Sequence, residues 1–162
     1  AVLKGACWTW IWIPERRNLT VFFPPDALPL AHSEYERRFW SVLRALHQAD
    51  ASPWPDSVSV DPDQASWEFC FAGEPVFVFC AAPSYRLRSS RNLGPGMLML
   101  MQPRRSFFGI EGHTRAGIQA RNKTRERLEK WDQMPVHPDL GCTASQTTGN
   151  GDSMFSLMAT RR

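Results

Sequence analysis

A cationic loop is the part of the sequence whose residue types are best suited to chemistry. Residues 83–95 carry three arginines and one tyrosine, with a proline at each end, between the apolar stretches 76–80 and 97–101. The planar guanidinium fork matches carboxylates and phosphates, so the loop is predicted to hold an anion. An arginine loop that faces solvent and holds no ligand is the alternative. The candidate binding residues are Tyr85, Arg86, Arg88, Arg91 and Asn92.

Other reactive arrangements are not recognisable in the sequence. The four cysteines form no CxxC pair, which argues against a zinc site. Cys70 and Cys80 lie within apolar stretches, where cysteine usually packs as a small hydrophobic residue. The sequence shows no Ser/His/Asp nucleophilic set and no glycine-rich phosphate loop. The arginine loop is therefore the leading candidate site.

Charge is distributed unevenly along the chain. The 162 residues carry a net charge of +3 and are 43% hydrophobic, which suits one globular domain. Residues 86–130 contain 11 basic and 3 acidic residues, a local charge of +8. Aromatic residues are not interleaved with those basic residues, which argues against a nucleic-acid stacking surface. A solvated helix face is the alternative interpretation of this basic region.

Hydrophobic patterns predict the elements that must position the loop. Two helices are expected, one after the capping-box order that begins at Ser33 and a second with Ile118, Leu128 and Trp131 turned inward. Together the elements predict an α+β fold with a mixed, largely antiparallel sheet covered by two main helices. Strands are expected at 8–13, 19–23, 67–71, 76–80 and 97–101, and helices at 34–49 and 115–132.

No signal peptide and no apolar run of membrane-spanning length is recognisable in the sequence. We therefore expect a reduced, cytoplasmic protein that does not interact with membranes. Its expected partner is a small molecule with an anionic group.

Several ordered blocks of the sequence resemble the YqcI/YcgG family. They include 35–50, the Phe-Ala-Gly-Glu-Pro-Val-Phe-Val run at 71–78, the arginine loop and 131–141, and they span roughly residues 19 to 141. The resemblance implies a haem-dependent oxygenase that hydroxylates a guanidine nitrogen of arginine or a related compound. Under this resemblance Arg86, Arg88 and Arg91 would hold haem propionates or a substrate carboxylate.

The resemblance also implies an iron ligand, for which the sequence offers two candidates. Cys80 would supply a thiolate and His113 an imidazole. Plain burial is the alternative for Cys80, and a capping or surface role is the alternative for His113. The family's Gly-Leu-His-Pro stretch is replaced here by Cys-Ala-Ala-Pro at 80–83, so its histidine is absent.

The two ends of the sequence depart from the family pattern. We expect one family-like domain at 1–141, atypical over 1–18, followed by an atypical tail at 142–162. Back-translated with GC-leaning codons and read one base out of frame, the tail gives Leu-Tyr-Gly-Gln-Pro-Asp-Asn-Arg-Glu-Trp. That string resembles the family's usual continuation, so we expect a one-base frameshift near Gly141.

Two functions from different classes follow from these patterns. The first is a haem-dependent N-hydroxylase of a guanidino or amino-acid-type small molecule. The second is a non-catalytic, degenerate or truncated relative that acts at most as a small-anion binding module. Binding of nucleic acid through residues 104–130 is a weaker third hypothesis.

Overall fold

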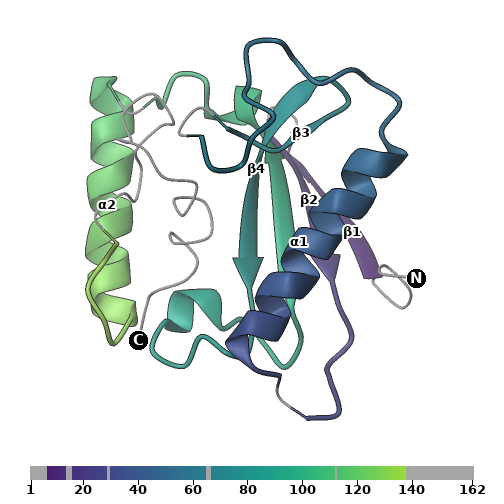
Figure 1. Ribbon diagram of the computed structural model, residues 1–162. Coiled ribbons are helices and arrows are strands. Elements are labelled where there is room, and N and C mark those ends of the chain that lie inside the picture. Colours follow the sequence, from purple (N-terminus) through teal and green to yellow (C-terminus); the bar gives the residue numbers. More distant parts are fainter. Residues whose placement is uncertain (1–6, 14–15, 29, 65–66, 112, 138–162) are drawn as a thin grey trace.

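The computed structural model describes residues 7–13, 16–28, 30–64, 67–111 and 113–137, with side chains from Asn18 onward. The atypical tail expected at 142–162 lies outside these residues, as do residues 1–6 of the expected atypical start. A five-stranded sheet forms the centre, in the order β1-β2-β5-β4-β3 (Figure 1). The strands are β1 (Cys7–Ile13), β2 (Arg16–Phe22), β3 (Cys70–Phe71), β4 (Glu74–Ala81) and β5 (Leu98–Pro103).

Every ladder of the sheet is antiparallel. β2 pairs with β5 from Leu19–Met101 to Phe22–Leu98, so β5 inserts between β2 and β4. The tight hairpin joining β3 to β4 turns at Ala72 and Gly73, whose φ angles are 54° and 72°. Positive φ at both central residues matches the right-handed twist of the flanking strands. The expected α+β fold with a largely antiparallel sheet is confirmed.

Helix α1 (His32–Ala49) covers one face of the sheet (Figure 1). Its buried residues repeat at helical spacing, which gives the helix one continuous apolar face. That face packs against alternate residues of β2, β4 and β5, because alternate strand residues point to the same side. The buried cluster that results includes Phe39, Val42, Val21, Val78 and Met99.

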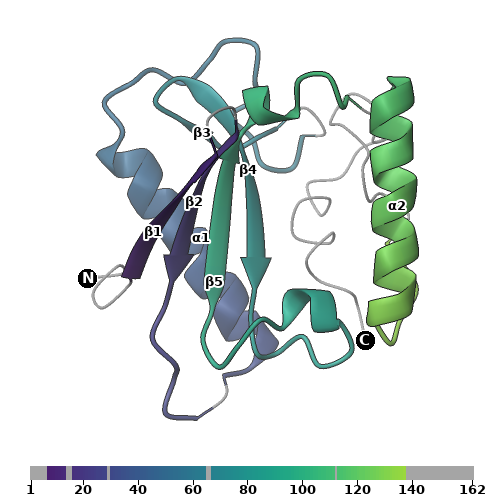
Figure 2. The ribbon, with the colours of Figure 1, turned by 180° about the vertical axis from the view of Figure 1, so that it is seen from behind.

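Helix α2 (Arg115–Trp131) stands beside the β4 side of the sheet, apart from α1, in both ribbon views (Figure 2). The prediction that Ile118 and Trp131 point inward is wrong, since they are 42% and 62% exposed. This helix contacts η1 (Ser89–Arg91), a short 3-10 turn in the arginine loop, and its buried Gly117 packs against the backbone of Ile110 and Glu111. The periodic pattern predicted the helix correctly but not the surface against which it packs.

Neither helix in the described part of the chain is long and apolar enough to cross a bilayer.

Candidate functional site

The three arginines of the predicted anion loop point in different directions. Arg88 is buried and forms an ion pair with Asp132, at 3.4 Å between Nη1 and Oδ2. It also donates to the carbonyl of Pro135 at 3.1 Å. Asp132 accepts two further hydrogen bonds, from the backbone N–H and the hydroxyl of Ser90, at 2.9 and 2.8 Å. Arg88 therefore ties the loop to the end of α2, and its charge is compensated inside the protein.

Arg86 and Asn92 are both exposed. Neither side chain contacts a partner among the described residues. Their position at the surface places them outside any enclosed site, and their role in holding an anion stays a prediction.

Arg91 is the arginine of the loop that lies in a partly dry environment. Its guanidinium lies over the Phe79 ring at 4.1 Å from the centroid, and Nη1 donates to the Cys80 carbonyl at 3.3 Å. Burial lowers the pKa of Arg91, although an arginine remains cationic at neutral pH. No carboxylate of the described residues forms an ion pair with it, in contrast to Arg88. This side chain is therefore a cation that still lacks an anion within the described part of the chain.

Tyr85 supplies a second anion-binding group. The residue is 7% exposed, and its hydroxyl has no hydrogen-bond partner among the described residues. Burial raises the pKa of Tyr85, and the nearby Cys80 thiol raises it further while Arg91 lowers it. A buried hydroxyl without a partner is rare because leaving it unpaired destabilises the fold. Tyr85 thus offers an O–H donor without a partner among the described residues, and the charge of Arg91 acts on it.

Helix α1 contacts Tyr85 and the residue before it through His32. His32 shares a hydrogen bond with the hydroxyl of Ser84, at 2.9 Å from Nδ1 to Oγ, and its ring meets Tyr85 edge-on at 4.7 Å. Glu36 is one helical turn further along, so it lies on the same face of α1 as His32. Burial is the main cause of the raised pKa of Tyr85, and the charge of Glu36 is a minor one. We call Arg91, Tyr85, His32 and Glu36 the Tyr85 site.

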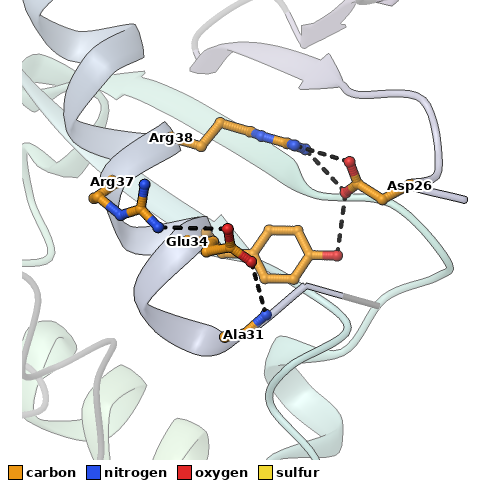
Figure 3. A network of polar contacts seen from close by, with 6 residues as sticks. Asp26, Ala31, Glu34, Arg37 and Arg38 are labelled. Atoms are coloured by element: carbon orange, nitrogen blue, oxygen red, sulfur yellow. Dashed lines mark hydrogen bonds and ion pairs between the residues drawn. The ribbon is translucent and has the colours of Figure 1, made fainter. Parts of the chain in front are cut away.

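A polar network holds the start of α1 in place and so fixes His32 and Glu36. The guanidinium of Arg38 donates two hydrogen bonds to Asp26, at 2.8 and 3.0 Å, and the hydroxyl of Tyr35 donates a third, at 3.3 Å (Figure 3). The cap predicted at Ser33 is wrong: the helix begins two residues earlier, with Ala31 as its N-cap, and the carboxylate of Glu34 accepts a hydrogen bond from the backbone N–H of Ala31. The segment before the helix is thereby joined to its first two turns.

The two candidate iron ligands occupy different environments. The side chain of Cys80 lies in the core cluster on the α1 side of the sheet, and burial raises the pKa of its thiol to about 12. The thiolate needed for ligation is therefore disfavoured. His113 is exposed in the turn before α2. The protonated thiol of Cys80 is a poor ligand for iron, and the role of His113 as an axial ligand stays a prediction, whereas Arg91 and Tyr85 are of the chemical type that holds a propionate or another carboxylate.

Sequence reasoning missed three residues that shape this site. His32 lies at the start of an amphipathic helix, and Glu36 lies one turn later on the same helix. Asp132, which neutralises Arg88, follows α2 directly as its C-terminal cap. No local pattern distinguishes these residues from ordinary helix-surface positions. A helical spacing of four between His32 and Glu36 was the available signal, and it is common.

Comparison with known protein families tests the family resemblance that the ordered sequence blocks suggested. The sequence profile of the YqcI/YcgG family matches residues 11–149. The chain belongs to the YqcI/YcgG family. Two relatives, YqcI and YcgG of Bacillus subtilis (strain 168), are each 39% identical over 76% of this chain, and the matches cover 50% and 49% of their own lengths.

A third relative of the YqcI/YcgG chain carries a functional name. It is the "Putative N(omega)-hydroxy-L-arginine synthase DcsA" of Streptomyces lavendulae, 36% identical over 76% of this chain and 47% of the relative. The chain thus spans about half the length of the curated relatives it matches. No solved structure matches the chain. The Tyr85 site lies wholly within the part that matches the YqcI/YcgG profile.

Proposed function

We propose that this YqcI/YcgG chain is part of an oxygenase that N-hydroxylates a guanidino or amino-acid-type small molecule, with haem as its cofactor. The name of the Streptomyces relative supports the reaction class. The observation that carries the proposal is the buried Tyr85 hydroxyl, which lacks a hydrogen-bond partner among the described residues, together with the charge of Arg91, which acts on Tyr85 and forms no ion pair with a described carboxylate. Together the two groups make an environment that a carboxylate would satisfy.

The Tyr85 site has groups for both ends of an amino-acid-type substrate. Arg91 and Tyr85 donate to a carboxylate, while Glu36 provides a negative charge for a guanidinium or ammonium group. No cationic side chain of the described residues forms an ion pair with Glu36, so its carboxylate is available to the substrate. Holding both ends fixes the orientation of the nitrogen that reacts, which is the main contribution a binding site makes to such a reaction.

N-hydroxylation of the substrate also requires O₂, two protons and two electrons. One oxygen atom of O₂ converts the N–H of the substrate to N–OH, and the other leaves as water with two protons. Two electrons come from an external reductant. Haem supplies this oxygen chemistry when it is bound. The residues of this chain bind and orient the substrate, or hold a propionate of the cofactor in the same way.

Binding of L-arginine and of hemin tests the proposal in separate steps. We expect L-arginine to bind in calorimetry, with an affinity about tenfold lower in Arg91→Gln and unchanged in Arg86→Gln, the matched exposed arginine of the same loop. Hemin titration should produce a shifted Soret band that persists in Cys80→Ala, because the buried thiol does not fit the ligand role. The proposal fails if L-arginine does not bind or if the two arginine variants lose affinity equally.

The non-catalytic alternative predicts a different combination of results. A small-anion binding module would bind L-arginine or a simple carboxylate through Arg91 and Tyr85 without a Soret shift. It would also yield no product with a mass increase of one oxygen atom when O₂, hemin and a reductant are present. This set of outcomes would replace the oxygenase proposal with the binding-module one.

A further inference from the structure

A hollow lies between the second half of α1 and the residues that connect α1 to β3. Figure 1 shows this connection passing the C-terminal end of α1. The volume of the hollow is about 220 Å³. A cavity of about 150 Å³ accommodates a benzene molecule, so this one has room for a single substituted ring. The hollow is lined by none of the four residues of the Tyr85 site, although Trp40 is one helical turn from Glu36. The hollow is therefore separate from the Tyr85 site.

Aromatic side chains from two segments form its walls. Trp40, Arg44 and His47 lie on one face of α1 at spacings of four and three. Trp54 and Trp67 come from the crossing loop. Trp40 lies 5.8 Å from Trp67 between ring centroids, and His47 meets Trp54 edge-on at 5.4 Å. We call this hollow the tryptophan pocket.

The loop wall is held in its conformation by its own hydrogen bonds. The indole N–H of Trp54 donates to the Val58 carbonyl at 3.1 Å, so its polar edge is satisfied and its ring remains as an apolar surface. Ser59 forms a backbone bridge with Trp67, which closes the loop. Because the loop is already ordered, a ligand does not have to order it, and the entropic cost of binding is lower.

The charges around the tryptophan pocket select the ligand class. None of its lining residues is acidic, and the exposed guanidinium of Arg44 has no carboxylate partner among the described residues. A cation would be attracted by the tryptophan faces but repelled by Arg44. We propose that the tryptophan pocket binds a single-ring aromatic acid, with the ring against the tryptophan side chains and the carboxylate on Arg44. This site is additional to the proposed N-hydroxylase function and does not depend on it.

Fluorine NMR with 4-fluorophenylacetate as the probe tests the assignment. We expect saturable changes in the fluorine signal at millimolar probe concentrations, as suits a ligand of this size. The cationic analogue 4-fluorophenethylamine should bind at least threefold more weakly. Arg44→Gln should lower the affinity for the acid about three- to tenfold, since it removes a partly exposed charge-assisted contact.

The matched control is Arg37→Gln, an exposed arginine on the same helix that pairs with Glu34 and lies outside the pocket. It should leave probe affinity unchanged, and Trp54→Leu should abolish saturation. Circular dichroism establishes that each variant is folded; Arg44 is exposed, so its variant keeps the fold. Equal or tighter binding of the amine, no saturable binding in the wild type, or equal losses in the two arginine variants would each overturn the proposal.

Discussion

The guanidinium of Arg88 lies 3.4 Å from the carboxylate of Asp132, 44 residues later in the chain, and both side chains are buried. This pair joins the arginine loop to the end of α2. Removing one partner of a buried pair leaves an uncompensated charge, which is more destabilising than loss of the attraction alone.

We therefore expect Arg88→Met to lower the free energy of unfolding by about 3 kcal/mol. Asp132→Asn should lower it by a similar amount. The double variant should be less destabilised than the sum, because no lone charge remains. Urea unfolding of the four proteins measures this coupling. Additive effects of the two substitutions would contradict the pairing.

Substitution of Tyr85 should affect ligand binding without lowering the stability of the fold. Tyr85→Phe removes a buried hydroxyl that has no partner among the described residues, so stability should stay within about 0.5 kcal/mol of the wild type or rise. Its affinity for L-arginine should fall about tenfold under the proposed function, because a donor to the carboxylate is lost. Urea unfolding and calorimetry on the same samples give both quantities.

The control for this substitution is Tyr35→Phe, which removes a hydroxyl that donates to Asp26. That variant should lose about 1 kcal/mol of stability and keep its affinity. Destabilisation of Tyr85→Phe by the same amount would show that its hydroxyl has a partner in the fold.

The lowered pKa of Asp26 predicts that the protein loses stability as the pH falls into the acid range. Hydrogen bonding from Arg38 is the main cause of the lowered pKa of Asp26, so the folded form holds the carboxylate charged more strongly than the unfolded chain does. The stabilisation is complete above the unfolded pKa of about 4 and is lost as the pH falls through the lower folded value. Asp26→Asn should thus be less stable than the wild type at pH 7, by about 1 kcal/mol.

The difference between these two proteins should shrink below pH 4, where the wild-type carboxylate becomes protonated. Urea unfolding at a series of pH values from 2 to 7 (roughly the span over which carboxyls titrate) measures it. A stability difference that stays constant over this range would show that Asp26 has no special pairing.

Cys70 and Cys80 should resist alkylation in the native protein. Burial raises the pKa of their thiols to about 11 and about 12, so little thiolate exists at neutral pH. With Cys7 and Cys142 replaced by serine, iodoacetamide should react only on the timescale of unfolding, as followed by mass spectrometry. Rapid reaction at Cys80 under native conditions would indicate an accessible thiolate and revive it as a candidate iron ligand.

Local sequence patterns predicted the elements well. The apolar repeat over 35–46 indicated α1, although the cap expected at Ser33 lies two residues beyond the observed N-cap, and the turn before Glu74 indicated the β3–β4 hairpin. These features depend on backbone geometry and on hydrophobic periodicity over a few residues, which the chain carries locally. The blocks that resemble the YqcI/YcgG family likewise needed no coordinates.

The sequence by itself determined the α+β elements, the family and the loop in which an anion-binding group would lie. Only the tertiary structure decided which arginine is available: Arg88 is neutralised by Asp132, whereas Arg91 lies over Phe79 near the unpaired hydroxyl of Tyr85. The reason is physical. Three arginines in one loop are equivalent in sequence, and their environments differ because distant segments supply a carboxylate to one, an aromatic ring to another and solvent to the third.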